Sequence, residues 1–455
     1  MKQIDTIVAI ATPYGRGGIG ILRISGSLVS KISYILLGKL LYPRKAEYLP
    51  FLGKNNIHLD YGIALFFLSP NSFTGEDVLE LQGHGGPIVL DLLLNHILSY
   101  KGIRIARPGE FLERAFLNNK LDLIQAEAIS DLINANSVQS VNLAINSIRG
   151  FFSNRINKLI KFITDLRVYI EGIINFPNEE INTLSNNKIN FFLDKIISNI
   201  NIVKSEAYQG VLLREGIKVV IIGKPNVGKS SLLNTIVNRD VAIVTNISGT
   251  TRDILRENIY VDGVPMQIID TAGICETNDE IERIGIKLAW LEVKQADHIL
   301  WVTNDILTLK SNSLEKILLK LNKKLKRDIP ITILFNKFNI TSKDVGFKKI
   351  DNLFYFTISA ISGEGVKMLL NYLKKNAGFN NNINFKFLAR RRHINALDLA
   401  SIHLLRAKEK FMSNYPIEFL AEELRISHQL ICNITGKFTS QDLLDKIFLN
   451  FCIGK

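Results

Sequence analysis

A nine-residue stretch in the middle of the chain, GKPNVGKSS at 223–231, constrains the fold more than any other feature. It follows the apolar run KVVII without a break and leads into SLLNTIV, which has the apolar spacing of a helix. The stretch matches G-x-x-x-x-G-K-[ST], in which glycines let backbone N–H groups face a phosphate, a lysine adds positive charge and a hydroxyl binds magnesium. We therefore expect a strand, a phosphate-binding loop and a helix; a glycine-rich turn is the weaker alternative.

The sequence after this loop continues as an alternation of short strands and helices. The apolar runs MQIID, HILWV and ITILF are separated by helical stretches, which is typical of a parallel sheet with helices on both faces. Polar motifs stand at the strand ends. ISGTTRD provides Thr250 and Thr251 for a switch loop, and IIDTAG provides Asp270 for a metal and Gly273 for the γ-phosphate. In this order, the motifs predict a GTPase of the Ras-like class.

A guanine-reading loop is expected where ILFNKFNI occurs. Asn336 fits a bond to the base and to the neighbouring loop, and Lys337 fits a position along the ring. Asn339 stands where such GTPases carry Asp, so we predict weakened binding of guanine. Ser359 and Ala360, in ISAISG, follow a later strand, where backbone N–H groups can meet the carbonyl oxygen of the base.

The predicted GTP-binding residues extend over all of these motifs. They are Asn226, Val227, Gly228, Lys229, Ser230, Ser231, Thr245, Asn246, Ile247, Ser248, Gly249, Thr250, Thr251, Asp270, Thr271, Ala272, Gly273, Asn336, Lys337, Asn339, Ser359 and Ala360.

Catalysis cannot follow the pattern of enzymes that orient water with a glutamine after the DTAG motif, because Ile274 stands there. A monovalent cation beside the phosphates and a distant carboxylate are an alternative. Asn226 provides an uncharged oxygen suited to potassium, and Glu282 is the candidate carboxylate. A solvent-exposed helix residue remains the other interpretation of Glu282.

The flanking sequence has a different character on each side. Residues 1–118 alternate strands such as TIVAIAT and VLELQ with turns, whereas 119–213 and 379–455 have apolar residues at helical spacing. Of these helices, INFFLDKIISNINIVKSEAYQGVLLREG is expected to end near Gly210. We predict a multidomain α/β protein in which the domain at 214–378 is inserted into an all-α domain whose two halves pack together.

Composition limits the classes of protein that remain. The chain has 455 residues, 47% of them hydrophobic, and no apolar run near the ~20 residues that span a bilayer. With no signal-peptide pattern, a cytoplasmic protein without a membrane partner is expected. Three cysteines provide neither a disulfide framework nor a zinc site. The net charge of +13 fits either a polyanionic partner or compositional drift, and ARRRH at 389–393 fits a solvated helix start.

Taken together, the chain resembles the MnmE (TrmE) family of tRNA-modification GTPases over essentially its whole length. The resemblance is carried by DTIVAIATPYGRGGIGILRISG, NSFTGEDVLELQGHGGP, ARPGEFLERAFLNNKLDLIQAEAI, the P-loop, FLARRRH and the terminal FCIGK. It implies an N-terminal α+β domain of the tetrahydrofolate-binding type that dimerises, and a Ras-like G domain inserted into the helical domain. It also implies attachment of an aminomethyl-type group, such as carboxymethylaminomethyl, to carbon 5 of the wobble uridine of certain tRNAs.

Cofactors, partners and further site residues also follow from the resemblance. It implies a homodimer, a heterotetramer with the FAD-containing protein MnmG, a 5-formyl- or methylene-tetrahydrofolate unit, magnesium, and potassium-stimulated hydrolysis of GTP. By matching position, potassium would contact Asn226, Thr245, Ile247 and Thr250, and magnesium would contact Ser230 and Thr251. Glu282 would orient the attacking water. Folate would contact Arg23, Glu80, Lys120 and Lys455, and Cys452 matches the cysteine of the family's tail.

A second function remains open from the residues alone. Many GTPases share the core at 217–378, so this segment fits a ribosome-assembly or signalling GTPase equally well. The first 120 residues and the FCIGK tail favour tRNA modification.

Overall fold

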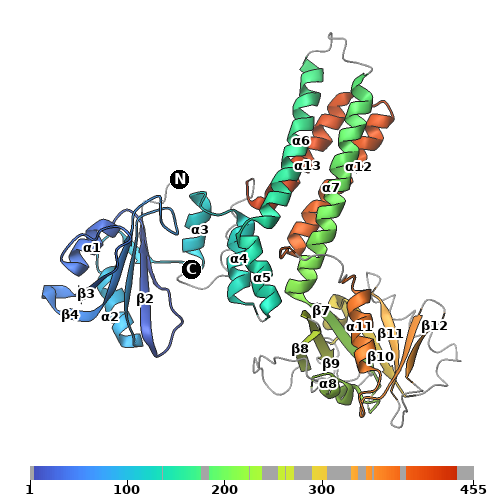
Figure 1. Ribbon diagram of the computed structural model, residues 1–455, viewed down its shortest axis with the longest axis horizontal. Helices are drawn as coiled ribbons and strands as arrows, with labels where there is room; N and C mark the ends of the chain where they lie inside the picture. Colours follow the sequence, from blue (N-terminus) through green and yellow to red (C-terminus); the bar gives the residue numbers. More distant parts are fainter. Residues whose placement is uncertain are drawn as a thin grey trace. The chain divides into compact units, whose positions relative to one another are not determined.

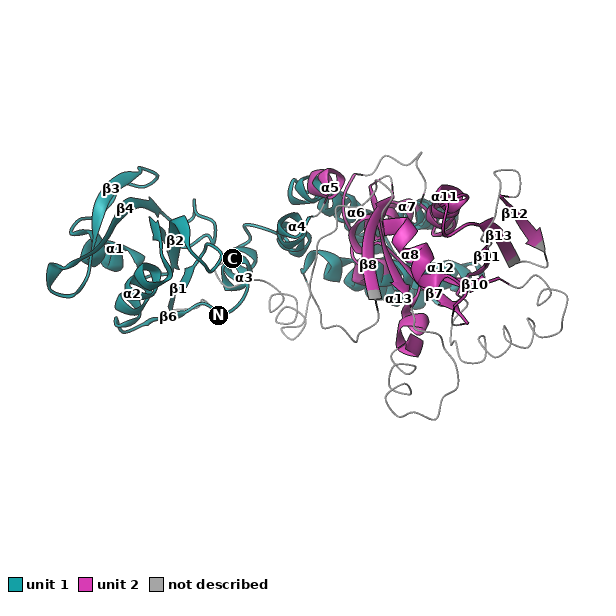
Figure 2. Cartoon of the chain, turned by 90° about the horizontal axis from the view of Figure 1, so that it is seen from below, with its two compact units in different colours: residues 1–135, 144–201, 395–455 teal, residues 136–143, 202–394 magenta. Residues whose placement is uncertain are grey.

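The structure is a computed structural model that describes residues 5–135, 137–175, 184–224, 226–237, 255–261, 263–270, 289–304, 329–336, 345–350, 353–379 and 386–437. These residues form two compact units (Figure 2). Unit 1 comprises residues 1–135, 144–201 and 395–455, and unit 2 comprises residues 136–143 and 202–394. Within the described residues, no helix is both long and apolar enough to cross a bilayer.

The N-terminal part of unit 1 is a six-stranded sheet with helices packed on one face (Figure 1). Its order is β3-β4-β5-β2-β1-β6, antiparallel except for the parallel pair of β1 and β6. The strands are β1 Thr6–Ile10, β2 Gly17–Ser25, β3 Glu47–Leu52, β4 His58–Phe67, β5 Val78–Gly85 and β6 Ile103–Ile105.

Alternation along these strands decides which face is buried. Leu22 and Ile24 of β2 belong to the core formed with helices α1 (Val29–Leu37) and α2 (Pro87–Leu98), as do Leu79 and Leu81 of β5. Because successive strand residues point to opposite faces, Arg23 and Glu80 lie on the face away from these helices. The short 3₁₀ helix η1 (Lys54–Asn56) joins β3 to β4.

Among the described residues, seven helices follow this sheet outside the inserted domain. They are α3 Glu110–Leu117, α4 Leu123–Ile133, α5 Val138–Ile148, α6 Phe151–Asn175, α7 Leu184–Glu215, α12 Arg391–Met412 and α13 Ile417–Thr435. Helix α13 packs on α6 and α4, and Lys408 of α12 pairs with Asp194 of α7. The two helical segments therefore pack together across the insertion, as predicted. The segment SQDLLDKIFLNF, expected to be helical, lies outside the described residues.

Unit 2 contains the inserted α/β domain. Its strands are β7 Ile217–Gly223, β8 Leu255–Val261, β9 Val264–Asp270, β10 His298–Thr303, β11 Ile331–Asn336, β12 Gly346–Ile350 and β13 Leu353–Ile358. Helix α8 (Lys229–Val237) follows β7, and α11 (Val366–Asn376) follows β13. The sheet order is β12-β13-β11-β10-β7-β9-β8, with only β8 and β12 antiparallel to their neighbours. This is the Ras-like arrangement, so the predicted fold class is confirmed.

The entry and exit of the insertion touch within unit 2. A Cβ on Gly210 would lie 2.7 Å from the Phe387 carbonyl oxygen, so glycine is required for this close approach of two backbones. Gln209 Nε2 donates to the Gly378 carbonyl at 2.6 Å, and Arg391 pairs with Glu215 at 2.6 Å. The predicted end of α7 near Gly210 is wrong: the helix continues to Glu215 because this glycine serves packing rather than termination.

The basic run at 389–393 starts a helix, as expected, but only part of it is solvated. Helix α12 begins at Arg391, whose side chain pairs with Glu215, whereas His393 is 2% exposed. The His393 Nδ1 accepts the backbone N–H of Arg390 at 3.0 Å and so satisfies a donor before the helix start.

Candidate functional site

The predicted nucleotide-binding motifs meet at one edge of the unit 2 sheet. The parallel strands β7, β9, β11 and β13 end at Gly223, Asp270, Asn336 and Ile358. Because the carboxyl ends of parallel strands share an edge, the loop after β7 faces the ends of its neighbours, the usual place for a ligand in an open α/β sheet.

The loop after β7 is shaped to hold a phosphate. Asn226 and Gly228 have φ values of +60° and +92°, which turn successive backbone N–H groups inward. Lys229 is only 8% exposed, and its ammonium donates to the carbonyl oxygens of Gly223 at 3.2 Å and Lys224 at 2.9 Å. A buried positive charge paired with neutral carbonyls favours an anion such as a β- or γ-phosphate.

Asp270 and Ser230 form the part of the site suited to a metal. The Ser230 hydroxyl donates to Asp270 Oδ2 at 2.9 Å. Asp270 is 6% exposed, and its Oδ1 has no hydrogen-bond partner among the described residues. Burial raises the pKa of Asp270 above its usual range, although the Ser230 hydrogen bond and the charge of Lys229 oppose this. A divalent cation would satisfy the buried oxygen, so these residues fit magnesium.

Asn336 joins the phosphate loop to the loop after β13. Its Nδ2 donates to the Val227 carbonyl at 2.9 Å, and its Oδ1 accepts the Ala360 N–H at 2.9 Å. Thr235 of α8 donates its hydroxyl to the Ala360 carbonyl. The buried amide of Asn336 thus joins three parts of the predicted site: the phosphate loop, the end of β11 and the loop after β13.

The backbone N–H groups that follow β13 each have an acceptor within the chain. Ser359 donates its N–H to the Glu364 carbonyl at 3.1 Å, and Ala360 donates to Asn336 at 2.9 Å, while their contact with the base stays a prediction. Both residues are buried, and a buried N–H takes the nearest acceptor. The expected contact of Asn336 with the neighbouring loop is present.

The predicted folate residues of unit 1 are partly assembled. Arg23 of β2 and Glu80 of β5 are cross-strand neighbours, and the Arg23 Nε donates to Glu80 Oε1 at 2.8 Å. The Arg23 guanidinium also lies over the rings of Phe73 at 5.3 Å and Phe111 at 5.8 Å. Lys120 Nζ donates instead to the Pro70 carbonyl at 2.9 Å.

Comparison with known proteins covers both units. The profile of the MnmE helical domain matches residues 123–452, and that of the GTP-binding protein TrmE N-terminus matches residues 6–120. The tRNA modification GTPase MnmE of Pectobacterium atrosepticum is 54% identical over 100% of both chains. The proteins of the same name from Erwinia tasmaniensis and Yersinia pestis are also 54% identical over 100% of both chains.

The chain belongs to the MnmE family of tRNA modification GTPases.

Membership in the MnmE family confirms the resemblance inferred from the sequence. Several predicted MnmE-type site residues lie outside the described residues, and their roles stay predictions. They are Thr245, Asn246, Ile247, Ser248, Gly249, Thr250, Thr251, Thr271, Ala272, Gly273, Glu282, Lys337, Asn339 and Lys455.

Sequence reasoning missed two contributors to these MnmE-type sites. Thr235 was read only as part of a helix, although its hydroxyl anchors Ala360. Phe73 lies inside the quoted motif NSFTGED, but its contact with Arg23 depends on a fold that joins a loop to a distant strand. Their residue types alone gave no signal for either contact.

Proposed function

We propose that this chain is a potassium-stimulated GTPase that acts in the cytoplasm with the FAD-containing protein MnmG. Together they add a (carboxymethyl)aminomethyl group to carbon 5 of the wobble uridine of certain tRNAs, using a one-carbon unit of 5-formyl- or methylene-tetrahydrofolate. The coarser statement, that the chain is a GTP hydrolase of tRNA modification, follows from full-length similarity at 54% identity. That similarity is the observation that carries the proposal.

The geometry of unit 2 supports the hydrolytic part. Lys229 provides a buried positive charge for the β- and γ-phosphates, and the backbone of residues 226–228 presents N–H groups to the same anion. Ser230 and Asp270 would hold magnesium, which when bound neutralises charge that develops on the phosphate oxygens. Asn226 is exposed and would provide an oxygen to potassium. We assign to Glu282 the orientation of the attacking water.

The geometry of unit 1 supports the use of folate. Arg23 and Glu80 form a charge-assisted pair, with their side chains 22% and 15% exposed. A carboxylate in this position can accept the N–H edge of a pterin, and cations can meet the carboxylates of the folate tail. We include Lys120 and Lys455 among those cations, and propose that the chain works as a homodimer and assembles with MnmG as a heterotetramer.

The proposal is tested by nucleoside mass spectrometry of tRNA from cells with and without this gene. The modified wobble uridine is expected only when the gene is present. A variant with Lys229→Ala is expected to remove the modification together with GTP hydrolysis. Unmodified uridine in both strains would contradict the proposal and favour a ribosome-assembly or signalling GTPase.

A second measurement separates the cofactors. GTP hydrolysis by the full chain is expected to be faster in potassium than in sodium at equal ionic strength. Equal rates in the two salts would remove potassium from the proposal and leave the GTPase intact.

A further inference from the structure

The loop at residues 69–77, SPNSFTGED, lies beside the Arg23–Glu80 pair. Phe73 stands at its centre, 38% exposed, with the Arg23 guanidinium 5.3 Å from the centre of its ring. A planar guanidinium is oriented by an aromatic face as well as by a carboxylate. Phe73 thus shares the contact with Arg23 with Glu80 and with the Phe111 ring at 5.8 Å, and it is the one of these three groups that belongs to the loop.

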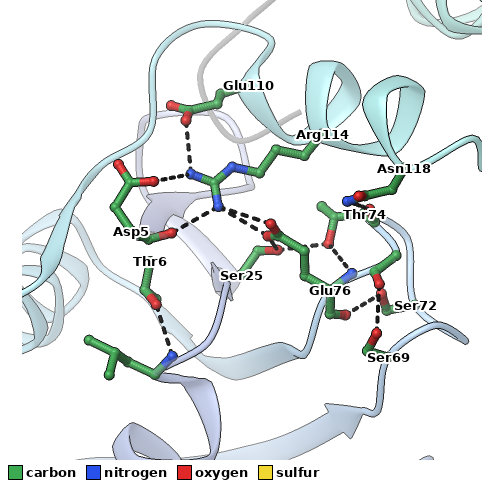
Figure 3. A network of polar contacts seen from close by, with 12 residues as sticks. Asp5, Thr6, Ser25, Ser69, Ser72, Thr74, Glu76, Glu110, Arg114 and Asn118 are labelled. Atoms are coloured by element: carbon green, nitrogen blue, oxygen red, sulfur yellow. Dashed lines mark hydrogen bonds and ion pairs between the residues drawn. The ribbon is translucent and has the colours of Figure 1, made fainter. Parts of the chain in front are cut away.

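Residues on both sides of Phe73 are hydrogen-bonded to other elements. On one side, Lys120 donates to the Pro70 carbonyl at 2.9 Å. On the other, Asn118 Nδ2 donates to the Thr74 carbonyl at 2.8 Å, and the hydroxyls of Thr74 and Ser25 are 2.7 Å apart (Figure 3). These contacts use the backbone and small polar groups of the loop, and they leave the Phe73 ring directed at Arg23.

Arg114 of α3 holds the end of this loop (Figure 3). Its Nη1 donates to Glu76 Oε2 at 3.0 Å, and the same carboxylate oxygen accepts the Ser25 hydroxyl at 2.8 Å. Arg114 is 2% exposed and also donates to Asp5 Oδ1 and Glu110 Oε1, both at 3.0 Å. A single buried guanidinium thus ties the 69–77 loop to α3 and to the residue before β1.

A network of this kind is a poor source of stability by itself. Burying a guanidinium and its carboxylates costs solvation, and well-packed apolar residues of similar volume stabilise a core as well or better. What charged hydrogen bonds add is direction, because each donor of the fork fixes one acceptor. The network therefore fits a role in placing the loop more closely than a role in holding the domain together.

We propose that Arg114 is a positioning residue of the Arg23–Glu80 site: through Glu76 it holds the 69–77 loop so that Phe73 orients Arg23 toward the ligand. This inference rests on the proposed function, in which Arg23 and Glu80 bind folate.

The test measures binding of 5-formyltetrahydrofolate to the full-length chain by isothermal titration calorimetry. Glu76→Gln keeps the shape and the acceptor for Ser25 but removes the charge that pairs with Arg114, and we expect affinity to fall by about tenfold. Phe73→Leu removes the ring at a residue that is 38% exposed, and we expect a similar loss. Phe73→Tyr keeps the ring and is expected to restore affinity to within about twofold.

Two comparisons separate positioning from general destabilisation. Leu36→Ala opens the core behind the opposite face of the sheet, and should lower the melting temperature while leaving folate affinity unchanged. The double variant Glu76→Gln with Phe73→Leu should lose no more affinity than the weaker-binding single variant, because both act through one contact.

The outcomes distinguish the inference from the function on which it rests. If Glu76→Gln and Phe73→Leu bind folate as the natural chain does, or if Leu36→Ala loses as much affinity as they do at an equal loss of stability, the positioning role is wrong while folate binding stands. Additive losses in the double variant would also contradict it. If the natural chain binds no folate, the proposed function fails and the inference fails with it.

Discussion

One oxygen of Asp270 has an environment suited to a metal ion. Its Oδ1 is buried without a hydrogen-bond partner among the described residues, while Oδ2 accepts the Ser230 hydroxyl. Burial raises the pKa of this carboxyl, so the site disfavours its charge until a cation arrives.

We expect Asp270→Asn to raise the magnesium concentration needed for nucleotide binding by about tenfold or more. The neutral amide keeps its contact with Ser230 but loses the charge that attracts the cation. The measurement is release of a fluorescent guanine nucleotide as magnesium is titrated. Asn234→Ala, an exposed change on helix α8, which also carries Ser230, is the matched control and should behave as the natural chain. Equal magnesium curves for Asp270→Asn and this control would contradict a metal role.

A second residue-scale prediction concerns Asn339, where the family pattern has Asp. A carboxylate accepts both the N1–H and the 2-amino group of guanine, whereas an amide accepts only one of them. We expect Asn339→Asp to raise GTP affinity by about one to three orders of magnitude. The natural chain should in turn bind xanthine nucleotides relatively better, since their 2-oxygen accepts from an amide. Titration of both nucleotides measures this, and equal GTP affinity for the two chains would refute it.

At the scale of elements, the phosphate loop packs closely against the end of β11 because Gly228 has no side chain. A Cβ on Gly228 would lie 2.1 Å from Asn336 Nδ2, and the φ of +92° is unfavourable for other residues. We expect Gly228→Ala to displace Asn336 from the Val227 carbonyl, to lower stability by about 1–3 kcal/mol and to weaken GTP binding at least tenfold.

The matched control for this change is Gly346→Ala at the start of β12 in the same unit, where a Cβ would meet nothing within 4 Å. It should leave both GTP affinity and the melting temperature near those of the natural chain. Comparable losses in the two variants would mean that crowding between residue 228 and Asn336 does not cause the loss of GTP affinity and stability.

The elements themselves were largely predictable. The run KVVII, a glycine loop and an amphipathic helix specify β7, the phosphate loop and α8 by local chemistry alone. Gly210 misled the prediction of the α7 end, because an interior glycine and a terminating glycine look alike until its neighbour, the Phe387 backbone, is known.

The contacts between elements were not predictable. Arg114 and Asp5 are 109 positions apart, and nothing local to either residue indicates the other. The same holds for Asn336 and Val227, whose hydrogen bond depends on two loops meeting at a sheet edge. Sequence patterns specified the chemistry of the nucleotide site, whereas the pairing of its buried polar groups required the fold.

At the scale of the whole molecule, the two units contain buried titratable groups that respond to different pH ranges. In unit 2, His298 is 2% exposed; its Nε2 bonds the Thr332 hydroxyl and its Nδ1 faces the Asn376 amide. Burial lowers the pKa of His298 to about 4. In unit 1, burial alone would raise the pKa of Glu110, but hydrogen bonds from Arg104, Arg107 and Arg114 outweigh it and lower the value to about 2.

These shifts predict that falling pH removes the contribution of His298 before that of Glu110. The imidazole of His298 binds a proton more readily in the unfolded chain, so its contribution of about 3 kcal/mol is lost as the pH falls from 6.5 to about 4. Glu110 contributes fully above pH 4.5 and loses its contribution as the pH falls toward 2. Both tryptophans of the chain, Trp290 and Trp301, lie in unit 2, so their fluorescence reports its unfolding.

Urea titrations followed by tryptophan fluorescence at several pH values measure this dependence. His298→Gln cannot take up the proton, and its stability should change much less between pH 6.5 and 4 than that of the natural chain. An unchanged slope in this variant would mean that other groups carry the acid sensitivity of unit 2.

The contact between Gly210 and the Phe387 backbone has a consequence for how such a gene can be assembled. Because the chain leaves and re-enters the helical domain at adjoining points, the helices need only a short connection there, and the inserted domain can replace it at little entropic cost. A domain attached in this way can be removed and its two attachment points joined by a short linker.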